Sequence, residues 1–156
     1  MSARPLPPHY HVGIVVPDIA AARVELSEQL GVTWGPIMHL DATAYRDEAG
    51  HDVELPTTMC YSVDDPHLEL IQEVPGTVWV CNEHSNLHHI GFWSDDLAAD
   101  STRLVGTGCP MQLCGRAGDV APTSFAYHRT GTGVRIEIVD AALREAMAFL
   151  FQADQS

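Results

Sequence analysis

An internal repeat constrains the fold of this chain more than any other feature of its sequence. The segment HVGIVVPDIAA at residues 11–21 aligns with HIGFWSDDLAA at residues 89–99. A histidine, a glycine, an aspartate and two alanines coincide in the two segments, and most of the remaining positions are apolar in both. A repeat of this kind indicates that the chain consists of two copies of one structural unit.

Each copy shows the same order of predicted elements. A strand comes first, Asp18 or Asp96 follows as a helix N-cap, and the helix ends near a glycine. Three segments with strand character then follow each helix, at residues 32–40, 51–63 and 67–74 in the first copy and at residues 109–114, 121–129 and 133–140 in the second. The stretches around 41–51 and 115–121 are rich in Gly, Ala and Asp and are expected to form loops beside a site.

This order predicts one α+β domain, residues 1–156, built from two βαβββ modules. The first module spans about residues 9–75 and the second about residues 87–140. A C-terminal helix at about 141–152 follows. A chain of 156 residues is long enough to bury a stable core.

The charge balance excludes several classes of function. The chain has a formal net charge of −13, with 21 acidic residues and eight basic ones, all of them arginines. No nucleic-acid or anionic-membrane partner is expected, because no basic patch can replace the counterions of a polyanion. Without lysine, the chain can form neither a side-chain Schiff base nor a phosphate-loop site. No apolar stretch approaches the roughly 18 residues of a membrane span, and a cytoplasmic location is expected.

Strand alternation places four chemically active residues on one face of the predicted sheet. In each opening and closing strand one row of side chains is apolar, and the opposite row carries a polar residue. These residues are His11, Glu69, His89 and Glu137. An unpaired carboxylate inside an apolar strand is costly, so a structural role explains the glutamates poorly. Two imidazoles and two carboxylates suit a divalent first-row metal ion with one or two positions left open.

The paired βαβββ units, the H-x-G pattern that opens each one and the glutamate in each closing strand resemble the vicinal oxygen chelate superfamily. This group includes glyoxalase I, methylmalonyl-CoA epimerase, extradiol dioxygenases and the fosfomycin- and bleomycin-resistance proteins. The resemblance covers His9 to Asp140 and is nearest in texture to the glyoxalase I and epimerase branch. It implies a cupped, eight-stranded mixed sheet around one metal site.

The resemblance also implies the ligands, the metal and the assembly. The family ligands fall on His11, Glu69, His89 and Glu137, and the ion would be nickel, cobalt, zinc or manganese. A homodimer is expected, and pairing of the modules within one chain or between chains stays open. Strand alternation places the neighbouring His88 on the helix-covered face or its rim, where a structural role is expected.

The family chemistry implies a divalent-metal-dependent lyase, isomerase or epimerase. Such an enzyme binds a carbonyl-containing substrate and moves a proton from the carbon next to the carbonyl. Glu137 is the first candidate for the base and Glu69 the second. Glu48 is a third candidate, because epimerase relatives carry a catalytic glutamate before a Gln-Gly pair in this region.

Aromatic and soft side chains are expected to line the substrate pocket, with one arginine near them. The candidates are Trp34, Met38, Trp79, Trp93, Phe125, Tyr127 and Arg116. Trp93 shares a row with His89 and is expected to face the cup. Such a lining favours a small apolar carbonyl compound over coenzyme A or glutathione conjugates, for which eight arginines leave few partners.

Two other classes remain open. An extradiol-type dioxygenase would bind Fe(II) through His11, His89 and Glu137, with Glu69 off the metal. A binding or resistance protein on the same fold would work without metal, although such proteins typically lose the ligands that this chain keeps. Metal content separates the classes, since iron favours the dioxygenase and the absence of metal favours the binding protein.

Overall fold

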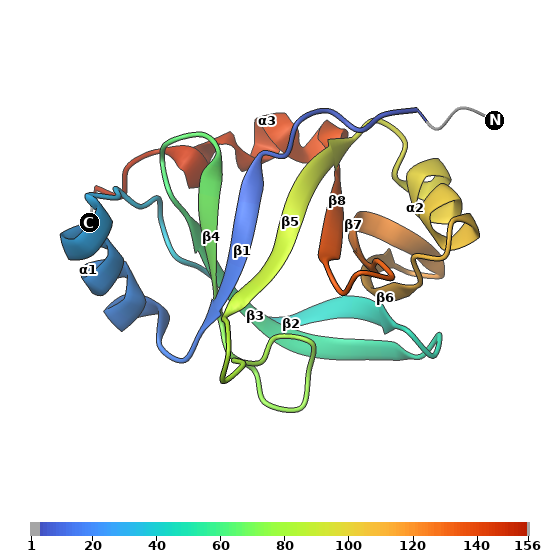
Figure 1. Cartoon of the computed structure of the whole chain (residues 1–156), viewed down its shortest axis with the longest axis horizontal. Coiled ribbons are helices and arrows are strands. Elements are labelled where there is room, and N and C mark those ends of the chain that lie inside the picture. Colours follow the sequence, from blue (N-terminus) through green and yellow to red (C-terminus); the bar gives the residue numbers. More distant parts are fainter. Residues whose placement is uncertain (1–3, 156) are drawn as a thin grey trace.

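The computed structural model describes residues 4–155, which form one closed, eight-stranded mixed sheet with helices on its outer side (Figure 1). The first module contains β1 (His11–Val16), α1 (Ile19–Leu30), β2 (Met38–Asp47), β3 (Asp52–Tyr61) and β4 (His67–Gln72). The second contains β5 (Leu87–Ser94), α2 (Leu97–Gly106), β6 (Met111–Ala117), β7 (Val120–Arg129) and β8 (Arg135–Asp140). The predicted α+β fold with a cupped mixed sheet is confirmed.

The two modules pair within one chain. Around the cup the strand order is β1-β4-β3-β2-β6-β7-β8-β5. In each module the first and last strands are parallel neighbours, β1 with β4 and β5 with β8. Antiparallel pairing of β1 with β5 and of β2 with β6 joins the modules at two seams. One chain therefore closes the sheet. The four strands that carry the predicted ligands, β4, β1, β5 and β8, lie side by side.

Local sequence signals explain the two longer helices. The Asp18 carboxylate accepts a hydrogen bond from the Ala21 N–H at 2.9 Å, and the Asp96 carboxylate accepts one from the Ala99 N–H at 3.0 Å. Both aspartates are therefore N-caps, as the repeat predicts. Gly31 ends α1 in a left-handed conformation with φ of 69°. Among residues 4–155, no helix is long and apolar enough to cross a membrane.

Each helix covers the outer face of its own module. The core under α1 contains Val16, Ile19, Trp34, Cys60 and Leu70. The equivalent core under α2 contains Leu97, Leu104, Cys114, Ala126 and Ile138. Residues of three predicted apolar rows pack in these cores, and the opposite row of each of these strands faces the cup. The packed residues are Ile14, Val16, Leu68, Leu70, Ile136 and Ile138.

Two predicted loops and the predicted last helix differ from the structure. Residues 41–47 belong to β2, and 115–117 belong to β6, so the loops shrink to tight turns. Register shifts in the β2–β3 and β6–β7 pairs accommodate these polar segments within long hairpins. The C-terminal segment is a 3₁₀ turn (Ala141–Leu143), the short helix α3 (Arg144–Met147) and a second 3₁₀ turn (Ala148–Phe151). It crosses one end of the cup (Figure 1).

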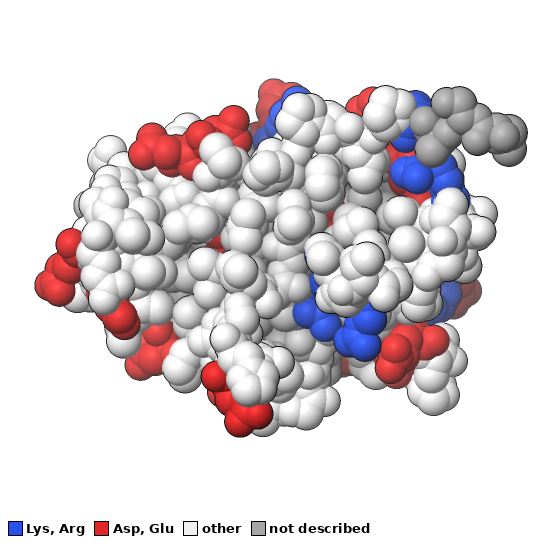
Figure 2. Space-filling view, in the orientation of Figure 1, with Lys and Arg blue, Asp and Glu red and all other residues white. Residues whose placement is uncertain are grey.

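Acidic side chains lie mostly around the margin of the face shown in Figure 2, and basic side chains gather in small groups. The centre of this face, over β1 and β5, is largely uncharged. On this face, the acidic residues that give the chain its formal net charge of −13 are therefore spread out and do not form a single patch. That the chain binds no nucleic acid stays a prediction.

Candidate functional site

Four polar side chains from four adjacent strands meet inside the cup. They are His11 on β1, Glu69 on β4, His89 on β5 and Glu137 on β8. All four are buried, and one donor atom of each lies within 4.8 Å of the donor atoms of the other three. The strand order β4-β1-β5-β8 brings them together, with the two histidines on the central strands and the glutamates on the flanking ones.

A glycine two residues after each histidine makes room for the imidazole of the other module. Gly13 lies opposite His89 in the β1–β5 pair, and Gly91 lies opposite His11. A Cβ atom on Gly13 would lie 2.1 Å from Cε1 of His89, and one on Gly91 would lie 1.9 Å from Cε1 of His11. The sequence reasoning missed this role, although the repeated His-x-Gly spacing places each glycine in the same row as its histidine.

The donor atoms have the spacing of ligands on one metal ion. Nε2 of His11 lies 2.8 Å from Nε2 of His89, 3.3 Å from Oε2 of Glu69 and 2.7 Å from Oε2 of Glu137. Nε2 of His89 lies 3.0 Å and 3.1 Å from the same two carboxylate oxygens. Adjacent ligands on an octahedral ion with bonds of about 2.1 Å lie about 3.0 Å apart. Neither Oε2 atom has a partner with hydrogen-bond geometry among the described residues, so the donor set fits a divalent cation.

The electrostatics of the cluster lead to the same interpretation. Burial opposes protonation of His11, but the carboxylates of Glu137 and Glu69 outweigh burial and raise its pKa to about 9. The pKa of His89 is raised by the same two carboxylates against burial. Burial opposes ionisation of the glutamates, but the histidines hold both carboxyl pKa values below their usual range. A divalent cation can replace the protons that balance these carboxylates.

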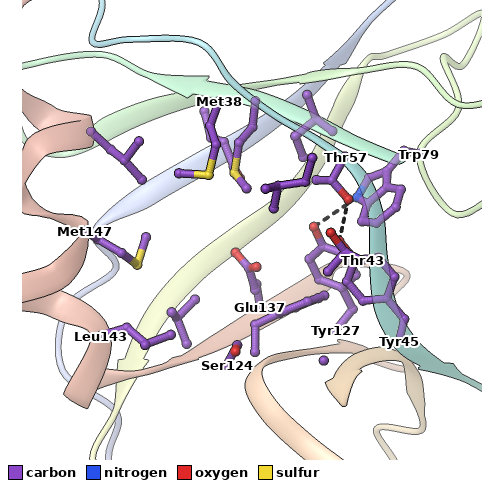
Figure 3. Close-up of a pocket in the computed structure, with 18 of the residues that line it drawn as sticks. Met38, Thr43, Tyr45, Thr57, Trp79, Ser124, Tyr127, Glu137, Leu143 and Met147 are labelled. Atoms are coloured by element: carbon purple, nitrogen blue, oxygen red, sulfur yellow. Dashed lines mark hydrogen bonds between the residues drawn. The ribbon is translucent and has the colours of Figure 1, made fainter. Parts of the chain in front are cut away.

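The carboxylates of the cluster face a cavity of about 340 Å³ (Figure 3). Glu137 projects into it, with Met147 and Leu143 of the C-terminal segment on one side and the rings of Tyr45, Tyr127 and Trp79 on the other. Further apolar lining residues are Met38, Leu40, Met59, Ile71, Phe125, Val139 and Leu150. Among the described lining residues, Glu69, Glu137 and Arg116 are the charged ones. The cavity is therefore mainly apolar, with its acidic groups at the donor cluster.

Residues 10–127 match the family model of the Glyoxalase/Bleomycin resistance protein/Dioxygenase superfamily. The chain belongs to this superfamily. The match confirms the resemblance inferred from the internal repeat, since it extends across both modules. No curated protein sequence matches the chain.

Solved structures share this superfamily fold at low sequence identity. A methylmalonyl-CoA epimerase from Streptomyces coelicolor in complex with 2-nitronate-propionyl-CoA has a TM-score of 0.62 and 18% identity, covering 88% of this chain and 99% of that one. The methylmalonyl-CoA epimerase from Mycobacterium tuberculosis has a TM-score of 0.59 and 21% identity, covering 95% and 97%. A hypothetical protein from Bacillus halodurans has a TM-score of 0.53 and 15% identity, covering 85% and 92%. These similarities establish the fold.

Five of the seven predicted pocket residues line the cavity, and two do not. Met38, Phe125, Tyr127 and Arg116 line the cavity, as does Trp79. The Trp79 indole N–H donates to the Tyr127 hydroxyl at 3.1 Å, which fixes both rings in the cavity wall (Figure 3).

The prediction that Trp34 and Trp93 line the cavity is wrong. Trp34 packs in the core under α1, and its indole N–H donates to the Arg23 carbonyl at 3.1 Å. The Trp93 ring stacks on Tyr10 with 4.0 Å between centroids and packs among residues of the C-terminal segment. This segment covers the end of β5. Trp93 therefore does not face the cavity, although it lies in the same row as His89.

Glu48 lies away from the donor cluster. It is exposed in the turn between β2 and β3 and does not line the cavity. The residues of β2 that line the cavity are Met38, Leu40, Thr43, Ala44 and Tyr45, which include no carboxylate. The prediction of Glu48 as a third candidate for the base is therefore wrong. The long β2–β3 hairpin carries Glu48 to its tip, whereas a loop beside the site was expected.

The prediction that His88 faces the helix-covered side is also wrong. The pairing of β1 with β5 shifts register between Gly13 and Ile14, and His88 is the extra residue on β5. The ring of His88 lies 5.2 Å from that of His89 and 5.3 Å from that of Tyr127, between centroids. Burial, with the neighbouring His89, lowers the pKa of His88 to about 3, so its ring is neutral at pH 7. A β-bulge, which strand alternation cannot anticipate, turns this side chain toward the cluster.

Proposed function

We propose that this protein is a divalent-metal-dependent isomerase, epimerase or lyase that moves a proton on the carbon next to a carbonyl group. One observation carries the proposal: two buried histidines and two buried glutamates converge, and both glutamates face a mainly apolar cavity. Membership of the superfamily and the shared fold with methylmalonyl-CoA epimerases support it.

His11, Glu69, His89 and Glu137 would hold the metal ion, which we expect to be nickel, cobalt, zinc or manganese. When bound, the ion supplies a Lewis acid that polarises a carbonyl oxygen and stabilises the negative charge that develops on it. Because both carboxylates line the cavity, substrate oxygens could reach an ion held by these four donors.

The two carboxylates would carry the proton. Glu137 is our first candidate for the base because it projects into the cavity (Figure 3), and its lowered pKa keeps it ionised at neutral pH. Glu69 lines the cavity from β4, on the other side of the histidine strands. A proton taken by one carboxylate and returned to the same carbon by the other would invert that carbon. A proton returned by the first carboxylate to the neighbouring carbon, the former carbonyl carbon, would isomerise the substrate.

The cavity wall favours a small apolar substrate. Arg116 is the cation among the described lining residues, and it is already engaged with the Gly118 carbonyl at 3.0 Å and the Asp52 carboxylate at 3.4 Å. The solved Streptomyces coelicolor epimerase holds an acyl-CoA ligand, but the phosphates of coenzyme A would find few cations here. We therefore favour a compact apolar carbonyl compound, with an acyl-CoA thioester as the alternative.

Metal analysis followed by solvent exchange tests the proposal. The purified protein would be assayed for bound metal, then incubated in deuterium oxide with methylmalonyl-CoA and with a panel of apolar hydroxyketones and diketones. We expect metal-dependent deuterium incorporation next to a carbonyl. The Glu137→Gln variant should lower the exchange rate by about 10²–10⁴-fold, whereas Glu54→Gln, on the exposed side of β3, should leave it unchanged.

Other results would replace the proposal. Bound iron with oxygen-dependent cleavage of a catechol would identify an extradiol-type dioxygenase. Failure to bind nickel, cobalt, zinc, manganese or iron would identify a metal-free binding protein. The homodimer stays a prediction, and light scattering of the same sample measures it.

A further inference from the structure

The β-bulge in β5 places a second histidine directly behind one of the candidate metal ligands. His88 is 7% exposed, and its Nδ1 lies 2.9 Å from Nδ1 of His89. Its other ring nitrogen, Nε2, lies 2.8 Å from the carbonyl oxygen of Val78. The ring of His88 thus connects the ligand to the backbone of the segment that joins the two modules.

The identity of the partners determines where the protons are. The Val78 carbonyl can only accept, so Nε2 of His88 carries a hydrogen and donates it. In the neutral His88 ring, Nδ1 is then an acceptor, and it accepts the Nδ1–H of His89. With its hydrogen on Nδ1, neutral His89 has its lone pair on Nε2, the atom that faces the carboxylates of the cluster.

We propose that His88 is the positioning residue that holds His89 in the form whose Nε2 can bind the metal. This inference rests on the proposed function, because it concerns a ligand of the same metal site. The segment that carries Val78 is itself fixed, since the Val74 N–H donates to the Trp79 carbonyl at 2.8 Å and Trp79 is 2% exposed. The chain of hydrogen bonds therefore runs from the fixed Val78 carbonyl through His88 to His89.

The other candidate histidine ligand has no such support. Nδ1 of His11 is buried and has no hydrogen-bond partner among the described residues. The position equivalent to His88 in the repeat is Tyr10, whose hydroxyl is also buried without a partner there. The two halves of the donor cluster thus differ in the groups behind their histidines, and only the second half fixes the protonated nitrogen of its ring.

Metal affinity of matched variants tests this role. His88→Phe keeps the volume of the ring but removes the acceptor. His128→Phe is the control, because His128 is also buried and bonded, to Cys109 O and Ser101 Oγ at 2.9 Å each, away from the cluster. We expect His88→Phe to weaken Mn²⁺ binding about 10–100-fold, His128→Phe to leave it within about threefold, and His88→Asn, whose Oδ1 can replace Nδ1 as acceptor, to restore most of it.

Nitrogen NMR of the histidine rings supplies a readout that does not depend on metal. In the metal-free protein at pH 10, the spectra should show the hydrogen of His89 on Nδ1 in the wild type, and a mixture of both forms in His88→Phe. Equal Mn²⁺ affinities of His88→Phe and His128→Phe, or a hydrogen on Nε2 of His89 in the wild type, would overturn the inference. Absence of metal binding by the wild type would overturn the proposed function instead, and the NMR experiment would still decide the role of His88.

Discussion

The glycines of the repeat define the site as much as its polar residues do. Gly13 and Gly91 lie beside the histidines of the opposite module, where any Cβ atom would overlap an imidazole ring. The rings can therefore approach each other across β1 and β5 until their Nε2 atoms are 2.8 Å apart. The absence of a side chain at these two glycines therefore sets how closely the two imidazole rings can approach each other.

Substitution of Gly91 should move His11 out of position. In Gly91→Ala the new methyl group would lie 1.9 Å from Cε1 of His11, and the buried ring has no space to move away freely. We expect a destabilisation of about 1–3 kcal/mol and a loss of metal affinity of about tenfold or more, measured by urea unfolding and by Mn²⁺ titration.

Gly106→Ala is the matched control for this prediction. A Cβ atom on Gly106, at the end of α2, would meet no atom within 4 Å. It should leave metal affinity unchanged and raise stability by at most about 1 kcal/mol. Equal metal affinities of the two variants would show that Gly91 does not make room for His11.

The C-terminal segment forms part of the cavity wall at one end of the closed sheet. Leu143, Met147 and Leu150 line the cavity, and the Asp154 N–H donates to the Trp34 carbonyl at 2.9 Å. Leu150 is 2% exposed. Short helical turns such as these depend on tertiary packing for their stability, so Leu150 fixes the position of the whole segment.

Truncation of Leu150 should therefore be costly, and truncation of its neighbour should not. We expect Leu150→Ala to lower the free energy of unfolding by about 2–5 kcal/mol, because it leaves a void under the segment. Phe149 is 53% exposed, and Phe149→Ala should change stability by less than about 0.5 kcal/mol. Chemical denaturation measures both, and similar losses in the two variants would contradict this packing.

In the whole molecule, both modules contribute to one buried cluster of charged side chains. The donors come from the first and last strands of each module, and the two carboxylates raise the pKa values of both histidines. In the metal-free protein at pH 7, His11, with a pKa of about 9, is protonated and must lose its proton before Nε2 can bind a metal ion.

Metal binding should accordingly release protons at neutral pH. Below the His11 pKa of about 9, a proton competes with the metal for the ligand, so the apparent affinity should rise with pH. The expected slope is about tenfold per pH unit for each proton displaced, and the rise should level off above pH 9. Calorimetry of Mn²⁺ binding in buffers of different ionisation enthalpy counts the released protons, and a count of zero at pH 7 would contradict the raised pKa.

Much of the fold and of the donor cluster was predictable because the signals are local and occur twice. The helix caps at Asp18 and Asp96 and the alternation within each strand depend on neighbouring residues. The repeat made equivalent positions visible, so His11 and His89 could be assigned to one face before any strand pairing was known. The structure places these histidines together with Glu69 and Glu137, and their binding of metal stays a prediction.

Periodicity and helix capping act over a few residues, so they specify the two modules, their helices and the inward rows of β1, β4, β5 and β8. Tertiary contacts set the remaining features. The bulge that turns His88 toward His89 arises from the register between β1 and β5. The C-terminal segment that covers Trp93, and the hairpin that carries Glu48 away, are set by packing between distant parts of the chain. Such contacts depend on how the sheet closes, and no local pattern encodes that closure.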